Sequence, residues 1–118
     1  MKNNIIQEKS FLFAVRIVKL YKHLIEKKKE FVLSKQLLRS GTSIGANIEE
    51  ETGGQSRKDF IAKLSIAYKE SREAGYWLRI LKETDFLTQK EFDSIYSNLE
   101  ELQKKLTIIL KTAKKNCD

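Results

Sequence analysis

The sequence predicts an all-α protein, an antiparallel up-down-up-down four-helix bundle. Three observations indicate this fold: the 118 residues contain no proline, four segments repeat apolar residues at the helical period, and short breaks separate these segments. Short connections between long helices make successive helices antiparallel. We expect one bundle domain over residues 1–113 and a frayed C-terminal tail over residues 114–118.

The first helix is expected from about residue 4 to residue 26, where Phe13, Ile17, Leu20 and Leu24 form one apolar stripe. Taking about 100° per residue, neighbouring apolar residues widen this stripe to an arc of about 220°. These neighbours are Phe11, Ala14, Val15, Val18, Tyr21 and Ile25. A surface helix needs a stripe of only roughly 100°. The first helix therefore has more apolar surface than one bundle core requires.

The second helix is expected over residues 32–52, after a loop formed by residues 27–30. The pair Gly53-Gly54 ends it, because glycine readily adopts the left-handed conformation of a helix C-cap. Gly41 and Gly45 make this helix slim, although each interior glycine costs about 1 kcal/mol relative to alanine. Close packing against a neighbouring helix explains these glycines better than a phosphate-binding loop does, since the G-x-x-x-x-G-K-[ST] pattern of such a loop is absent.

The third helix is expected over residues 56–83, with Ser56 as its N-cap and Asp59 three residues later in a variant of the capping box. A second apolar edge, roughly opposite its main stripe, carries Ile66, Trp77 and Ile80. Thr88 and Glu91 form the capping box of the fourth helix, whose apolar stripe is Phe92, Ile95, Leu99, Leu102, Leu106, Ile109 and Ala113.

The composition limits the classes of function. Cys117 is the only cysteine, so no intrachain disulfide is possible and a reducing cytoplasm is the expected compartment. Glu8 and Lys9 interrupt any signal-peptide core, and no apolar run approaches the roughly 20 residues of a membrane span. We therefore expect no targeting segment and no contact with a membrane.

The formal charge of +7 is placed unevenly along the chain. Residues 1–40 hold ten lysines and arginines against three glutamates, whereas the two signs balance in the remainder. The candidate nucleic-acid-binding residues are Lys9, Arg16, Lys19, His23, Lys27, Lys28 and Lys29. No aromatic residue interleaves with them, so we expect contacts to phosphates of RNA or DNA rather than to bases. A solvated lysine face that only aids solubility is the alternative.

A second cluster on the third helix consists of Glu70, Glu73 and Trp77. If Gly53-Gly54 centres the hairpin, Arg39 lies level with Glu70. This arrangement predicts a structural ion pair, either within one chain or between subunits, with Trp77 buried or at an interface. Catalysis by the two glutamates has little support, because no partner groups accompany them.

Other catalytic and metal chemistry is not expected. The chain has one histidine, His23, whereas di-iron bundles need two Glu-x-x-His pairs. No serine, threonine or cysteine has a candidate base nearby in the sequence. The sequence predicts no metal site, no cofactor and no enzymatic activity.

Several segments together resemble a bacterial four-helix-bundle family whose members include proteins encoded in intervening sequences of 23S ribosomal RNA genes. These are LSKQLLRS at 33–40, TSIGANIEE at 42–50, SRKDFI at 56–61, Lys69-Glu70, Glu73 and YWL at 76–78. The sequence departs from the family pattern at residues 51–52, where small residues are usual, and at residues 74–75, where a bulkier pair is common.

The resemblance implies a homo-oligomer, a ring of five. The chain is also similar to the basic pentameric accessory proteins of diversity-generating retroelements, which bind nucleic acid and a reverse transcriptase. The resemblance implies no catalytic residues. We expect a cytoplasmic, non-enzymatic homo-oligomeric scaffold that binds RNA or DNA through its basic face. The alternative is a protein-interaction scaffold with no nucleic-acid role, in which the charge serves solubility.

Overall fold

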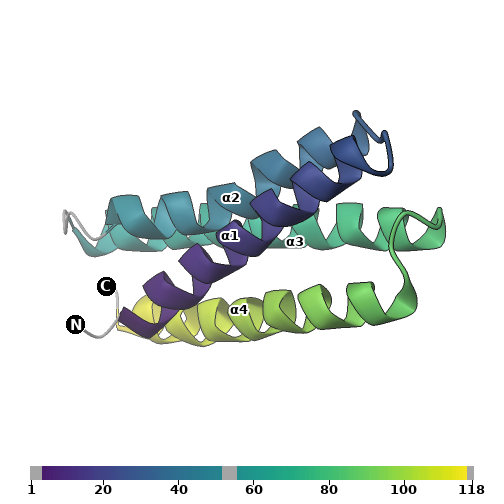
Figure 1. Ribbon diagram of the computed structural model, residues 1–118. Helices are drawn as coiled ribbons and strands as arrows, with labels where there is room; N and C mark the ends of the chain where they lie inside the picture. Colours follow the sequence, from purple (N-terminus) through teal and green to yellow (C-terminus); the bar gives the residue numbers. More distant parts are fainter. Residues whose placement is uncertain (1–3, 52–55, 117–118) are drawn as a thin grey trace.

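Four α-helices build the molecule: α1 (Asn4–Glu26), α2 (Leu33–Glu51), α3 (Arg57–Glu83) and α4 (Gln89–Lys115), as Figure 1 shows. The computed structural model describes residues 4–51 and 56–116, and within these ranges no strand occurs. The predicted all-α four-helix bundle is confirmed. The glycine pair expected to end the second helix lies outside the described residues.

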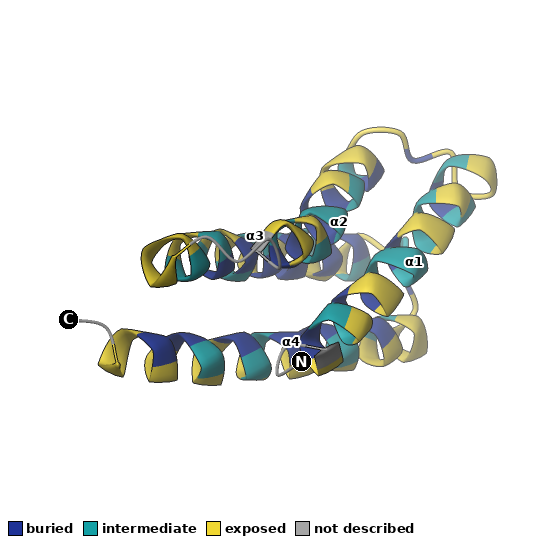
Figure 2. Cartoon of the chain, turned by 90° about the vertical axis from the view of Figure 1, so that its left-hand side faces the viewer, coloured by how far each residue is buried: buried dark blue, intermediate teal, exposed yellow. Residues whose placement is uncertain are grey.

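Each helix packs against the next one along the chain, and α1 also contacts α4. In Figure 1 successive helices run in opposite directions. Both Figure 1 and Figure 2 show that α1 is inclined to α4 and diverges from it towards the α1–α2 connection. The side between α1 and α4 is therefore the open side of the bundle.

The core lies along the inward faces of all four helices, which are dark blue in Figure 2. Most of the apolar stripe predicted for the first helix, and most of that predicted for the fourth, is buried here. The largest fully buried apolar side chains are Phe13, Ile17, Leu24, Leu37, Ile44, Leu64, Leu78, Leu81, Leu99, Leu102 and Leu106. Close packing of these side chains is the main source of stability for the fold.

The glycines of α2 bring α1 and α2 close together. A Cβ atom added at Gly41 would lie 2.8 Å from Cγ1 of Ile17, and one added at Gly45 would lie 3.3 Å from the carbonyl oxygen of Ser10. A side chain at Gly41 therefore has no room unless Ile17 moves. This contact explains why residue 41 is a glycine: it allows α1 and α2 to pack closely, as expected from the sequence.

Side-chain caps begin α3 and α4 where the sequence predicts them. The Thr88 hydroxyl accepts a hydrogen bond from the backbone N–H of Glu91, and the Glu91 side chain accepts one from the N–H of Thr88. The capping box predicted for the fourth helix is thus confirmed. The Ser56 hydroxyl accepts a hydrogen bond from the N–H of Asp59 at 3.1 Å.

The fourth helix is longer than expected. It continues to Lys115, so the first two residues of the predicted tail, residues 114–115, belong to α4. The N–H of Asn116 donates to the carbonyl oxygen of Thr112 at 3.2 Å and completes the last turn. Lysines in a last turn also interact favourably with the negative end of the helix dipole, which explains why helical structure persists here.

The N-terminus of α2 has a cap that the sequence analysis missed. Glu30 is buried, and its carboxylate accepts hydrogen bonds from the backbone N–H groups of Val32, Leu33 and Ser34. The Ser34 hydroxyl donates in return to the carbonyl oxygen of Glu30 at 2.7 Å. A carboxylate is well suited to this position because it meets both the free N–H groups and the positive end of the helix dipole.

Large apolar side chains of α1 remain exposed, among them Phe11 and Val18 of the predicted wide arc and also Ile5 and Leu12, which lie outside that arc. Phe11 is 65% exposed, Leu12 is 54% exposed and Ile5 is 59% exposed. At about 100° per residue, Phe11 and Val18 lie on one side of α1, while Ile5 and Leu12 lie on another. The helix thus presents two separate apolar surfaces. No helix within the described ranges is long and apolar enough to cross a membrane.

Candidate functional site

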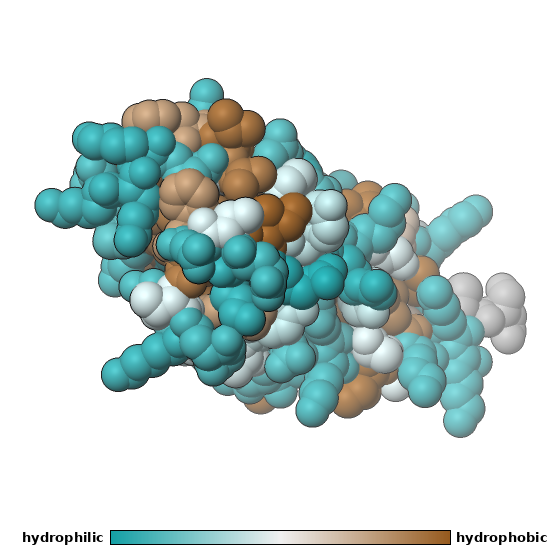
Figure 3. All heavy atoms as spheres, turned by 90° about the vertical axis from the view of Figure 1, so that its right-hand side faces the viewer, coloured by the Kyte–Doolittle hydropathy of each residue, from teal (hydrophilic) through white to brown (hydrophobic). Residues whose placement is uncertain are grey.

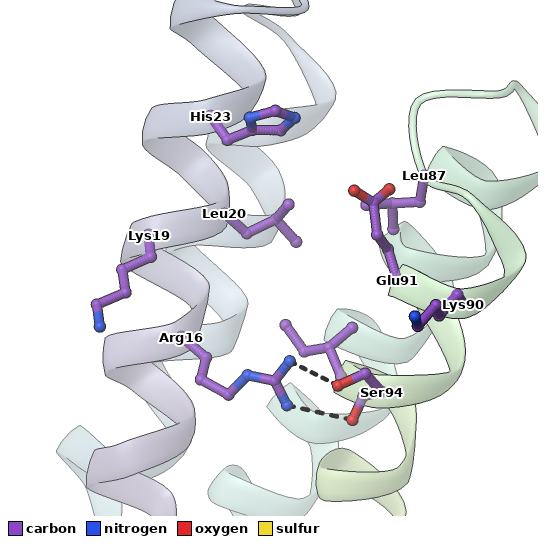
Figure 4. A pocket seen from close by; sticks show the side chains of 9 residues that line it. Arg16, Lys19, Leu20, His23, Leu87, Lys90, Glu91 and Ser94 are labelled. Atoms are coloured by element: carbon purple, nitrogen blue, oxygen red, sulfur yellow. Dashed lines mark hydrogen bonds between the residues drawn. The ribbon is translucent and has the colours of Figure 1, made fainter.

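The candidate site is a groove between α1 and α4 at the end where these helices diverge (Figure 4). We call it the α1/α4 groove. Its cavity volume is about 560 Å³. It is lined by Arg16, Lys19, Leu20, His23, Leu87, Lys90, Glu91, Ser94 and Ile95. Three of the seven predicted nucleic-acid-binding residues therefore lie at this groove.

Arg16 joins the two walls of the α1/α4 groove. Its guanidinium donates to the carbonyl oxygen of Ser94 at 3.2 Å, to the Ser94 hydroxyl at 2.9 Å and to the side-chain oxygen of Asn98. Figure 4 shows the side chain reaching across from α1 to α4. These bonds hold the guanidinium in place, so its charge is presented to a ligand from a fixed position.

Lys9 forms a second link between α1 and α4. It lies near the N-terminus of α1, far from the α1–α2 connection. Its Nζ atom lies 3.1 Å from Oε2 of Glu101. Both side chains are partly exposed, so the pair contributes little stability. Because Glu101 neutralises this lysine, Lys9 is a weaker candidate for binding an anion than the other basic residues of α1.

The other predicted basic residues are placed around the divergent end. Lys19 is exposed and points away from α4, whereas His23 is half-buried and points towards α4 (Figure 4). Lys27, Lys28 and Lys29 are exposed in the α1–α2 connection. None of these lysines forms an ion pair with any residue that the structure describes.

The one carboxylate that lines the groove is already engaged. A hydrogen bond from the backbone N–H of Thr88 lowers the pKa of Glu91, and the Thr88 hydroxyl and the positive charges of His23 and Lys28 lower it further, against the opposing effect of partial burial. Glu91 therefore remains ionised while capping α4. Arg16, Lys19 and Lys90 leave the groove with an excess of positive charge.

The chemistry of the groove suits an anion better than a catalytic reaction. Its floor contains the buried apolar side chains of Leu87 and Ile95, and its rim is cationic. Among the lining residues, Ser94 has the only aliphatic hydroxyl, and that group is hydrogen-bonded to Arg16 rather than to a base. Within the described ranges, no three His, Cys, Asp or Glu side chains cluster in a way that would hold a metal.

The second predicted cluster forms an ion-pair network within one chain. An Nη1 atom of Arg39 lies 3.3 Å from Oε1 of Glu70, and the other guanidinium nitrogen bonds to Glu73. The indole N–H of Trp77 donates to Glu73 at 3.2 Å. The hydrogen bond from Arg39 lowers the pKa of Glu73, and the bond from Trp77 adds to this effect. The network joins α2 to α3, with Trp77 half-buried beside it.

Several residues of the α1/α4 groove were missed by the sequence analysis. Lys90, Ser94 and Asn98 belong to the fourth helix and showed no basic or binding pattern of their own. The available signal was the set of basic residues along α1, which indicated a basic face but not the helix that it faces. Pairing this face with α4 requires the three-dimensional arrangement.

Apolar side chains are also exposed at the end of the bundle that carries the groove. Phe31 is 57% exposed and Val32 is 70% exposed, both in the connection after Glu30. Figure 3 views this end of the molecule and shows exposed apolar atoms surrounded by hydrophilic side chains. The divergent end thus combines free lysines with apolar surface.

Comparisons with known proteins identify relatives of this chain. The sequence model of the 23S rRNA-intervening sequence protein family matches residues 2–108. A crystal structure from Bacteroides thetaiotaomicron VPI-5482, of a protein with unknown function from the S23 ribosomal protein family, is 54% identical in sequence, with a TM-score of 0.91. The match covers 94% of this chain and 99% of that one. No curated protein sequence matches. Sequence and fold agree that the chain belongs to the 23S rRNA-intervening sequence protein family.

Proposed function

We propose that this protein is a non-enzymatic, homo-oligomeric helical scaffold of the cytoplasm that binds RNA or DNA through phosphate contacts. The observation that carries the proposal is the group of exposed lysines at the divergent end, which have no carboxylate partner among the described residues. Lys27, Lys28 and Lys29 of the α1–α2 connection, which we call the loop lysines, form this group together with Lys19 of α1. Unpaired cations at one end of a basic protein favour binding to a polyanion.

The contacts are to phosphates rather than bases. The α1/α4 groove has aliphatic side chains on its floor and, apart from His23, no aromatic ring on which a base would stack. Lysine ammonium groups act as point charges that bind phosphate oxygens without selecting a sequence. Binding is therefore tolerant of sequence and strongly dependent on salt.

Self-association is the second part of the proposal. The two apolar surfaces of α1 point in different directions, and Ile66 of α3 is also exposed. A contact between two different patches is heterologous, and repetition of such a contact closes into a ring when the rotation allows. A ring of five is the size that the family resemblance implies.

Self-association is tested by sedimentation equilibrium at micromolar concentration. We expect a species several times the 13.8 kDa of one chain. Phe11→Gln combined with Val18→Gln should reduce the oligomer size, because it makes one of the two apolar surfaces polar. A monomer for the unmodified protein would overturn this part of the proposal.

Nucleic-acid binding is tested by titrating the protein into labelled mixed-sequence single-stranded RNA at several salt concentrations. The triple variant Lys27→Gln, Lys28→Gln, Lys29→Gln should reduce the slope of log affinity against log salt by about 2, since each phosphate contact contributes roughly 0.7. A matched triple variant, Arg57→Gln, Lys58→Gln, Arg72→Gln, removes the same charge from other exposed positions. It should change the slope little.

The alternative is a scaffold for another protein, supported by the exposed Phe31 and Val32 beside the loop lysines. This function predicts a partner that stays bound after nuclease treatment and is lost when Phe31→Gln and Val32→Gln are introduced. Absence of RNA and DNA binding at low salt, together with such a partner, would favour this alternative over nucleic-acid binding.

A further inference from the structure

A second cationic groove lies between α3 and the C-terminal half of α4. We call it the α3/α4 groove; its cavity volume is about 380 Å³. Its walls include Ser65, Tyr68 and Lys69 from α3 and Lys111 and Lys114 from α4, together with Leu110. Leu110 is buried and forms an apolar base below the three exposed lysines.

Among the residues that the structure describes, none that lines the α3/α4 groove is negatively charged. No carboxylate lines it, and Lys69, Lys111 and Lys114 form no ion pair with any described residue. Residues 102–116 of the sequence contain five lysines and neither aspartate nor glutamate. Positive charges from two helices therefore converge on one cavity without a compensating group from the described part of the chain.

Helix stability explains only one of the three lysines. Lys114 lies in the last turn of α4, where a cation interacts favourably with the helix dipole. Lys111 lies one turn earlier, beyond the terminal turn in which this effect is significant, and Lys69 lies in the middle of α3. The helix dipole therefore does not account for the position of Lys69 and Lys111 beside Lys114.

The two grooves lie on different flanks of α4. The α1/α4 groove is lined by α1 and α4, and the α3/α4 groove by α3 and α4, so each groove lies between α4 and a different helix. About 20 residues also separate the groove centres along α4, which corresponds to roughly 30 Å. One nucleic-acid segment held at the α1/α4 groove thus leaves the α3/α4 groove free.

We infer that the α3/α4 groove is a second phosphate-binding site, which takes the backbone of a separate nucleic-acid segment. Three ammonium groups and the hydroxyls of Ser65 and Tyr68 supply donors for phosphate oxygens, and the apolar base accommodates the sugar. The inference rests on the proposed function, because it assigns the same class of ligand. It adds that each chain holds two segments, one between α1 and α4 and the other between α3 and α4.

The test is a stoichiometric titration of a labelled 12-nucleotide mixed-sequence RNA at low salt. Lys69→Gln, Lys111→Gln, Lys114→Gln should lower the number of RNA molecules bound per chain by about half. The loop triple variant at residues 27–29 should lower it similarly, and combining both sets should abolish most binding. The matched triple variant at Arg57, Lys58 and Arg72 should bind as the unmodified protein does.

The outcomes separate the two proposals. If the groove triple variant binds RNA with unchanged stoichiometry and salt dependence, this inference is wrong and the proposed function stands. If the unmodified protein binds no RNA, both fail. Inorganic phosphate, added at constant ionic strength, distinguishes the source of the phosphate: nuclear magnetic resonance shifts at Lys69 and Lys111 with phosphate but not with RNA would overturn the nucleic-acid assignment.

Discussion

Helix α1 packs against its two neighbours in contrasting ways. Towards α2, Ile17 reaches the backbone of Gly41 so closely that a single added Cβ would lie 2.8 Å from it. Towards α4, the helix diverges, and the long polar side chains of Arg16 and Lys9 reach across to α4 through hydrogen bonds and an ion pair. The side of α1 that faces α2 is held by close packing, and the side that faces α4 is linked to it by hydrogen bonds and an ion pair.

This difference separates stability from binding. Close packing at Gly41 leaves no space for a ligand, whereas the polar contact with α4 leaves a groove of about 560 Å³. The tightly packed side can hold α1 in position, so the open side need not be filled by apolar side chains. Three predictions test this contrast, from the largest expected effect to the smallest, and a fourth tests the weaker polar contact between α2 and α3.

The largest effect is expected from truncating the side chain that fills the α1–α2 contact. Ile17→Ala should lower the free energy of unfolding by about 2–5 kcal/mol, because Ile17 is fully buried. Leu20→Ala, one helical turn later at the α1/α4 groove, should cost about 1 kcal/mol or less, because Leu20 is only half-buried. Denaturant unfolding measures both. Equal losses would mean that the groove is packed as tightly as the core.

Substitutions at Gly41 and Ile17 should have coupled effects on the free energy of unfolding. Gly41→Ala should lower the free energy of unfolding by up to about 2 kcal/mol, since overpacking costs about 1–3 kcal/mol and alanine recovers about 1 kcal/mol of helix propensity. In the Ile17→Ala background the clash is gone, so Gly41→Ala should become neutral or stabilising. Additive effects in this double-mutant cycle would contradict the close contact.

The polar side of α1 should respond less. Arg16→Met removes the hydrogen bonds to Ser94 and Asn98 and should lower the free energy of unfolding by about 1 kcal/mol, because these bonds are partly exposed. Lys19→Met, at an exposed position of the same helix, is the control and should change it by less than about 0.5 kcal/mol. A loss of unfolding free energy for Arg16→Met as large as that for Ile17→Ala would mean that this contact contributes as much stability as the core.

The smallest effect is a pH dependence in the Arg39 network between α2 and α3. Because Arg39 lowers the pKa of Glu73 in the folded state, its stabilisation is complete above the unfolded pKa, about 4.3. It is lost as the pH falls through the folded pKa. Glu73→Gln should lower the melting temperature slightly at pH 7, and the difference should disappear towards pH 3. A difference that grows in acid would contradict this sign.

Much of the fold follows from local sequence signals. The capping box at Thr88 and Glu91 involves residues three positions apart, and the apolar stripes repeat within each helix, so both are readable without knowing the tertiary structure. The level positions of Arg39 and Glu70 follow from antiparallel helices joined by a short turn. Local spacing therefore predicts the helices and the α2–α3 register.

The candidate sites depend on contacts that local spacing does not encode. Arg16 and Ser94 are 78 residues apart, and the inclination of α1 decides whether they meet. Lys69 and Lys111 come from different helices, so the lysine-rich segment 102–116 does not by itself indicate a groove shared with α3. From the sequence alone, Glu30 is assigned only to a loop, because its capping role depends on how the preceding loop returns towards α2.

The Glu30 cap has a consequence for the energetics of the lysines that precede it. The loop is tied at one end by the carboxylate and at the other by a hydrogen bond from the N–H of Glu30 to the carbonyl oxygen of Leu24. Lys29 between them adopts a left-handed backbone conformation, with φ of 56°. The backbone entropy of this loop is therefore lost during folding rather than during association. When a ligand binds, the backbone that carries these lysines is already ordered. Only the lysine side chains still lose conformational freedom.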